Sequence, residues 1–321
     1  MSSRNPTATT PPPDRYAADG RAATTTLDTT TTVGIEPGLV PESAADKEPR
    51  ARKALWRSLV TGSGLVGVTL VLGVLVLSIV GPFATSYAPD QQIDGAYLLQ
   101  PSGAHWLGTD DLNRDLLSRV LNGIRVDLAI VFIAVPIGAV LGIAAGLITV
   151  SHPVSDVVTQ RTFDVILAFP ALLLGIALTA VLSPGAPTIV IVIAIAEIPI
   201  FGRLTRTAVL TVRELPYVEA ARVSGASTFH ILRRHVLPNS VEALGVQFAL
   251  SLSLAVFIEG ALSYLGIGVV PPTPSLGGIL AAGNGYLETN PWFSVGPLVV
   301  ISALVLGFYL IAQSISDARR H

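Results

Sequence analysis

The sequence predicts an all-α integral membrane protein with six transmembrane helices. Half of its 321 residues are hydrophobic and only 13% are charged, against roughly 25% charged residues in an ordinary soluble domain. Mean hydropathy is +0.63. Several uncharged runs reach the roughly 20 residues that a helix needs to cross the hydrocarbon core of a bilayer. A water-soluble enzyme of this length is excluded, because its surface would lack polar side chains to cover it.

Six segments are predicted to span the membrane. Pro136 predicts a kink in the second segment, and the third ends at a Pro/Gly-rich breaker over residues 183–187. The fourth segment has a short apolar run, residues 188–201, which Glu197 and Pro199 interrupt. The six segments cover residues 60–80, 128–150, 165–182, 188–207, 243–265 and 293–316.

The distribution of arginine and lysine predicts the orientation, because these residues are enriched in cytoplasmic segments. With the N-terminus inside, 17 of the 20 lysine and arginine residues fall in inner segments. The outer segments hold only Arg114, Arg119 and Arg125. Both termini are therefore predicted to be cytoplasmic.

Two regions of different composition follow from this topology. Residues 1–57 are rich in Thr, Pro and Ala and are predicted to form a disordered cytoplasmic tail. Residues 58–321 form the predicted transmembrane domain, with an outer loop over 81–127 and a cytoplasmic loop over 208–240. The basic cluster at the end of the tail is interpreted as a positive-inside anchor rather than a nucleic-acid patch, since the formal net charge is −2.

Catalytic signatures are missing from the sequence. It contains no G-x-x-x-x-G-K-[ST] phosphate-binding loop, no H-E-x-x-H and no G-x-S-x-G. It contains no cysteine, and His230 and His235 are five residues apart, a poor spacing for one ligand face. We therefore expect no catalytic site, no metal site and no cofactor in this chain.

The cytoplasmic loop is longer than a connection between two spans requires. Pro216 suits the first turn of a short helix, Gly225 supplies a break, and Ser227 caps a second short helix ending before Pro238. From the pattern alone, an amphipathic helix pair on the lipid headgroups and a docking element are equally compatible with this loop.

The residues Glu219-Ala220-Ala221, Gly225 and Leu237-Pro238 resemble the EAA loop of binding-protein-dependent ABC importer permeases. In that family the loop carries the coupling helix that sits in a groove of the cytosolic ATPase subunit. The family pattern has Ile at the position of His235, but the run Arg-His-Val-Leu-Pro-Asn is similar to the variant of the dipeptide and oligopeptide branch.

Two further stretches resemble the same branch. Residues 259–268, followed by Pro271-Pro272-Thr273-Pro274-Ser275, are similar to its end of span five. Residues 105–119 are similar to its outer-loop motif, with Asn113 where glycine is usual. The motif positions of that outer loop include Gly108, Thr109, Asp110, Arg114 and Asp115.

This resemblance extends over about residues 55–320 and implies the second permease subunit of a dipeptide or oligopeptide importer. It implies a type I importer permease fold in the bacterial cytoplasmic (inner) membrane. The implied partners are a homologous permease, two ATPase domains that bind ATP and Mg, and an extracytoplasmic substrate-binding protein. The same architecture serves nickel chelates and glutathione. A secondary transporter would require inverted repeats and broken helices with ion ligands at the midplane, and neither is clear in the sequence.

Two glutamates lie inside predicted spans, where an ionised carboxylate costs at least about 2.5 kcal/mol. For Glu197 we expect an ion pair with Arg203 or Arg206 slightly more than a role in the pathway. Glu259 is compatible with a helix–helix hydrogen bond or with a gate that attracts cations, and Ser263 with packing or with the pathway lining.

The end of the outer loop carries an apolar face at helical spacing. It predicts an amphipathic helix at the outer membrane interface that leads into the second span. Packing against the bundle is favoured over direct contact with substrate. The apolar face consists of Leu112, Leu116, Leu117, Val120, Leu121 and Ile124.

Overall fold

The computed structural model describes residues 57–149, 153–216, 218, 223, 225 and 237–318. The regular elements in these residues are all helices, so the all-α prediction is confirmed. Five helices are long and apolar enough to cross a bilayer, and a bent helix pair supplies a sixth span if it counts as one. The count that includes the bent pair agrees with the six spans expected from the sequence.

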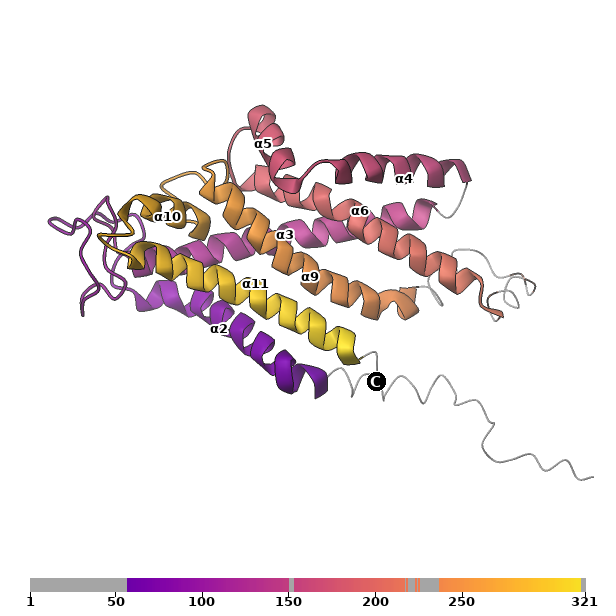
Figure 1. The fold of residues 1–321 in the computed structure, drawn as a ribbon, viewed down its shortest axis with the longest axis horizontal. Helices are drawn as coiled ribbons and strands as arrows, with labels where there is room; N and C mark the ends of the chain where they lie inside the picture. The colour runs from indigo at the N-terminus through magenta and orange to yellow at the C-terminus, as the bar shows by residue number, and fades with distance from the viewer. Residues whose placement is uncertain are drawn as a thin grey trace, which may run out of the picture. The chain divides into compact units, whose positions relative to one another are not determined.

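The helices follow one another along the chain with short connections at most positions (Figure 1). Their bounds are α2 (Gly62–Ala84), α3 (Leu116–Thr149), α4 (Pro153–Ala168), α5 (Ala171–Leu182), α6 (Ala186–Arg213), α9 (Leu237–Tyr264), α10 (Leu276–Gly283), the 3-10 helix η2 (Asn284–Tyr286) and α11 (Trp292–Ala318).

The third predicted span differs most from its expected form. Instead of one helix over residues 165–182, the structure has α4 and α5, whose axes are bent by 91° at a short break. Pro170 stands at this break with φ −55° and ψ 133°. Proline lacks the N–H that a continuing helix needs, and it disfavours helical backbone at the preceding residue. The break therefore follows from a proline inside an otherwise apolar run.

The predicted outer amphipathic helix is not a separate element. α3 begins at Leu116 and continues as one helix of 34 residues to Thr149. Leu112 precedes it in a turn and is exposed, so it does not share the apolar face. Asp115 and Arg119 are buried rather than facing solvent. These two charged residues thus point into the protein, where Asp115 binds His105 and Arg119 binds Asp110.

The long helices pack side by side, with α11 between α2 and α9, and with α3 against α6 (Figure 1). At Gly142 on α3, an added Cβ would lie 2.5 Å from the carbonyl oxygen of Ile198 on α6. Gly138 and Gly146, one turn to either side, approach α6 equally closely. Small residues at four-residue spacing let two membrane helices bring their backbones together. This seam is the centre of the helix packing.

The bundle has one end that carries most of the long connections. Residues 85–115, α10 and η2 lie together there, and we call this the loop end (Figure 1). Asn290, which is fully buried, ties the two connections by donating from Nδ2 to the carbonyl of Leu99 at 3.2 Å. The opposite end of the bundle carries the connection between α6 and α9.

Candidate functional site

The connection between α6 and α9 contains the segment predicted to couple to an ATPase. Gly225 is exposed, and its φ of +83° is in the left-handed region that favours glycine. This left-handed backbone agrees with the break predicted at Gly225. Nearer to α6, Val218 is fully buried, and its N–H donates to the carbonyl of Leu215 at 2.9 Å.

Leu237 and Pro238 open the next helix. Both lie in the first turn of α9, where proline is tolerated because the first N–H groups of a helix have no intrahelical acceptor. The predicted short helix after Ser227 lies outside the described residues. So do four of the residues singled out for coupling, namely Glu219, Ala220, Ala221 and His235.

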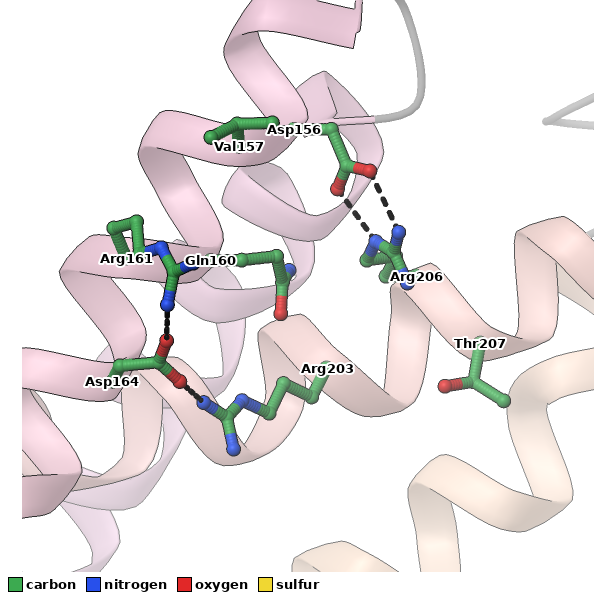
Figure 2. A pocket seen from close by; sticks show the side chains of 8 residues that line it. All are labelled: Asp156, Val157, Gln160, Arg161, Asp164, Arg203, Arg206 and Thr207. Carbon is green, nitrogen blue, oxygen red and sulfur yellow. Dashed lines mark hydrogen bonds and ion pairs between the residues drawn. The ribbon is translucent and has the colours of Figure 1, made fainter.

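A cavity of about 520 Å³ lies between α4 and α6 in the half of the bundle away from the loop end. Figure 2 shows that two ion pairs cross it from one helix to the other. Arg206 binds Asp156 through two bonds of 2.6 Å, and Arg203 binds Asp164 at 2.5 Å. The lining residues are Asp156, Val157, Gln160, Arg161, Asp164, Arg203, Arg206 and Thr207. These pairs hold α4 against α6.

The expected ion pair of Glu197 with Arg203 or Arg206 is wrong. Arg206 lies nine residues further along α6, which places it half a turn out of phase with Glu197. The side chain of Glu197 is only 1% exposed, and its Oε2 accepts a hydrogen bond of 2.5 Å from Ser251 Oγ on α9. Gln247 Nε2 in turn donates to Ser251 Oγ at 3.2 Å. Glu197 therefore links α6 to α9 through neutral polar groups.

Glu259 and Ser263 are also buried, near the loop end of α9. Ser263 Oγ donates to Glu259 Oε1 at 2.7 Å. The carboxyl of Glu259 is close enough to that of Asp127 on α3 for the two to interact electrostatically. Asp127 Oδ2 also accepts from the backbone N–H of Leu276 at 2.9 Å. In this conformation neither carboxyl reaches the surface of the subunit.

The outer-loop motif builds a self-bonded turn ahead of α3. Asp110 is fully buried, and its carboxylate accepts from the Arg114 N–H at 2.8 Å and from Arg114 Nε at 2.6 Å. Arg119 Nε lies 3.4 Å from the same carboxylate. Thr109 is fully buried as well, and its Oγ1 accepts from the Leu99 N–H at 2.8 Å.

The remaining motif residues complete this turn. Gly108 has φ +79°, and an added Cβ would lie 2.2 Å from the carbonyl oxygen of Leu99. Asp115 caps α3 by accepting from the Ser118 N–H at 2.8 Å, and it also binds His105 Nδ1 at 2.8 Å. The loop's own hydrogen bonds thus account for these residue types without a ligand.

Sequence reasoning missed three carboxylates. Asp156 and Asp164 bind the arginines of α6, and Asp127 lies next to Glu259. Asp156 and Asp164 are eight residues apart and so lie on one face of α4, a spacing that could have indicated a contact surface. By sequence, Asp127 falls just outside the second span, which is predicted to begin at residue 128. The earlier start of α3 brings Asp127 into the helix bundle.

Comparison with known proteins identifies the family of the chain. Residues 134–321 match the model of the family described as "Binding-protein-dependent transport system inner membrane component". A dipeptide transport system permease protein of Alkalihalophilus pseudofirmus is 35% identical over 255 residues, 79% of this chain and 84% of that protein. A glutathione transport system permease protein of Pectobacterium atrosepticum is 34% identical over 269 residues, 83% of this chain and 89% of that protein.

A solved structure has the same fold. A chain of the MetNI methionine ABC transporter in an inward-facing conformation matches with a TM-score of 0.51 and 20% identity. The match covers 63% of this chain and 95% of that chain. At this identity it supports the fold alone. With the family match over more than half of the sequence, the chain is a multi-pass membrane protein that belongs to the family of binding-protein-dependent transport system inner membrane components.

Proposed function

We propose that this chain is a transmembrane permease subunit of an ATP-driven ABC importer for dipeptides and oligopeptides. It forms the translocation pathway together with a second, homologous permease. The observation that carries the proposal is the family match together with relatives of 34–35% identity whose names state peptide or glutathione transport. The alternative is the same architecture importing glutathione, a nickel chelate or another small solute.

Energy for transport comes from other chains in this proposal. The sequence holds no phosphate-binding loop, so ATP and Mg bind to two partner ATPase domains. These domains dock on residues 208–240, with Glu219 and Gly225 in the contact region. Gly225 supports this role, because its exposed left-handed backbone produces a sharp turn on the surface.

The loop end faces the outside of the bacterial inner membrane in this proposal, and both termini are cytoplasmic. The distribution of arginine and lysine supports this orientation. A substrate-binding protein then delivers substrate at the loop end. Residues 1–57 form a cytoplasmic tail outside the transport domain. Glu197, Glu259 and Ser263 act on the gate through helix packing, since their burial places them between helices of one subunit.

Variants of the coupling connection test the proposal. Gly225→Val forces a side chain into left-handed backbone, and Glu219→Lys reverses a charge in the contact region. We expect normal abundance of the permease in membranes but loss of ATPase co-purification or of substrate-stimulated ATP hydrolysis. Gly62→Val and Asp317→Lys are the matched controls and leave both unchanged: Gly62 is exposed with φ +56° and open space around it, Asp317 is an exposed acid on α11, and both lie outside residues 208–240. Unchanged coupling in Gly225→Val and Glu219→Lys would contradict the proposal.

A further inference from the structure

Asp127 on α3 and Glu259 on α9 bring two carboxyl groups together inside the bundle. Asp127 and Glu259 are 2% and 1% exposed, and their carboxyls are close enough to interact electrostatically. We call them the carboxyl pair. Two ionised carboxylates in contact repel strongly, and removal from water makes each charge still more costly. Two buried carboxyls are stable next to each other when one is protonated and its O–H donates a hydrogen bond to the other, which is ionised.

No cation in the described residues compensates the carboxyl pair. Arg119, on the same helix, is paired with Asp110 and lies about 12 Å along α3 from Asp127. Arg125 is exposed. α5, α10 and the connection 265–275 contain no titratable side chain. The other described titratable groups on the helices packed around the pair are Tyr264 on α9, Glu197, Arg203 and Arg206 on α6, Asp156, Arg161 and Asp164 on α4, and Tyr309 and Asp317 on α11.

The partners of those groups leave the carboxyl pair without a compensating positive charge. Arg203 and Arg206 bind the aspartates of α4, and Glu197 is bound to Ser251, two turns below Glu259 on α9. Oδ1 of Asp127 is buried and receives no hydrogen bond from a donor in the described part of the chain. A proton on the carboxyl pair supplies the missing donor.

The carboxyl pair lies at the centre of a chain of hydrogen bonds that joins three elements. The Val269 N–H donates to Ser263 Oγ at 3.3 Å, and Ser263 Oγ donates to Glu259. On the other side, the Leu276 N–H at the start of α10 donates to Asp127. At Gly277 an added Cβ would lie 2.2 Å from the carbonyl oxygen of Gly260. The backbones of α10 and α9 are therefore in close contact next to the carboxyl pair. Asp127 thus lies between Glu259, the first residue of the 259–275 motif, and Leu276, the residue that follows it.

From this arrangement we propose that Asp127 and Glu259 form a proton-binding site that holds one proton at neutral pH and fastens α10 to α3 and α9. The ligand is a single proton, and the pair carries one negative charge in total. Loss of that proton leaves two adjacent carboxylates and opens the contact between the helices at the loop end. The site is independent of which solute the importer carries.

Infrared spectroscopy tests the site directly. The purified permease complex is studied in a Glu197→Gln background, because Glu197 is another buried carboxyl within the spans. The difference spectrum between this parent and the additional double change Asp127→Asn/Glu259→Gln should show one protonated-carboxyl C=O band at neutral pH. Glu288→Gln, which removes an exposed acid at the loop end, should leave the band in place. Absence of the band from the parent, or its survival in the double variant, would overturn the proposal.

The dependence of stability on pH gives a second readout. The folded pair holds a proton that unfolded carboxyls release at neutral pH, so the folded state binds more protons and its stability falls as pH rises. The Tm of the parent complex in nanodiscs should therefore fall from mildly acidic to mildly alkaline pH. In Asp127→Asn the amide donates to Glu259 without exchanging a proton, and the fall should be reduced. An equal fall in the parent and in Asp127→Asn would count against a shared proton, even if both proteins are fully assembled.

Discussion

Ser251 on α9 donates a hydrogen bond of 2.5 Å to Glu197 on α6, and this bond joins two membrane helices through a fully enclosed carboxyl. It replaces the ion pair with an arginine that the sequence favoured. A neutral donor satisfies the buried carboxyl without adding a second charge to the bundle. The polar contact that Glu197 makes with α9 therefore depends on one hydroxyl.

Removing that hydroxyl should weaken the contact. In Ser251→Ala the carboxyl of Glu197 loses the donor that the structure assigns to it, and we expect a loss of stability of about 1 kcal/mol. Ser78→Ala on α2 is the control, since Ser78 bonds only to a carbonyl within its own helix. The Tm of the purified complex measures both variants. Equal losses of Tm in the two variants would show that the bond to Glu197 stabilises the protein no more than the bond within α2 does.

The ion pairs between α4 and α6 should hold the bent segment in place. Asp156→Ala removes the bidentate partner of Arg206 at a partly exposed position, for which we expect a cost of about 1 kcal/mol. Faster amide hydrogen exchange in α4 would report this loosening. Arg161→Ala is the control, because Arg161 is 81% exposed and its contact with Asp164 is 3.4 Å long.

A charge swap separates the ion pair from other effects of the change. Combining Asp156→Arg with Arg206→Asp keeps the pair but reverses its direction between the helices. Slow exchange in α4 should return in the double variant and be lost in each single variant. Exchange that stays fast in the double variant would argue against the pair as the cause.

The glycine seam between α3 and α6 should tolerate no added methyl group. At Gly142 the new Cβ would collide with a backbone carbonyl, and we expect Gly142→Ala to cost roughly 1–3 kcal/mol. The control is Gly73→Ala on α2, where an added Cβ meets nothing within 4 Å. Helix propensity alone would make both changes slightly favourable. Thermal unfolding of the two variants decides, and a stabilised Gly142→Ala protein would refute the close packing.

The spans could be predicted because bilayer thickness sets the length of an apolar run. The contacts between spans could not, because helices that are apolar on every side carry no amphipathic signal for their rotation. Asp127 and Glu259 are 132 residues apart, and only the packing of α3 on α9 brings them together. The bend at Pro170 follows from a visible proline, whereas Pro136 and Pro199 lie inside helices that continue. A proline therefore did not by itself distinguish a break from a continuous span.

The composition of residues 1–57 leads to a prediction about the tail. Deleting residues 1–50 should leave membrane insertion, complex assembly and transport nearly unchanged, because this segment lacks the apolar residues needed for a core. Western blots of membranes and uptake assays on the same cells compare the truncated and full chains. Normal insertion with a large loss of transport would show that the tail binds a partner needed for function.

Uptake of a labelled dipeptide by proteoliposomes is the most direct test of the assignment. The vesicles contain this chain, its homologous permease, the two ATPase domains with ATP inside, and the substrate-binding protein outside. The account predicts peptide accumulation that requires ATP and ceases when this chain is omitted. Accumulation driven by an ion gradient without ATP, or peptide uptake that persists in vesicles lacking this chain, would contradict it.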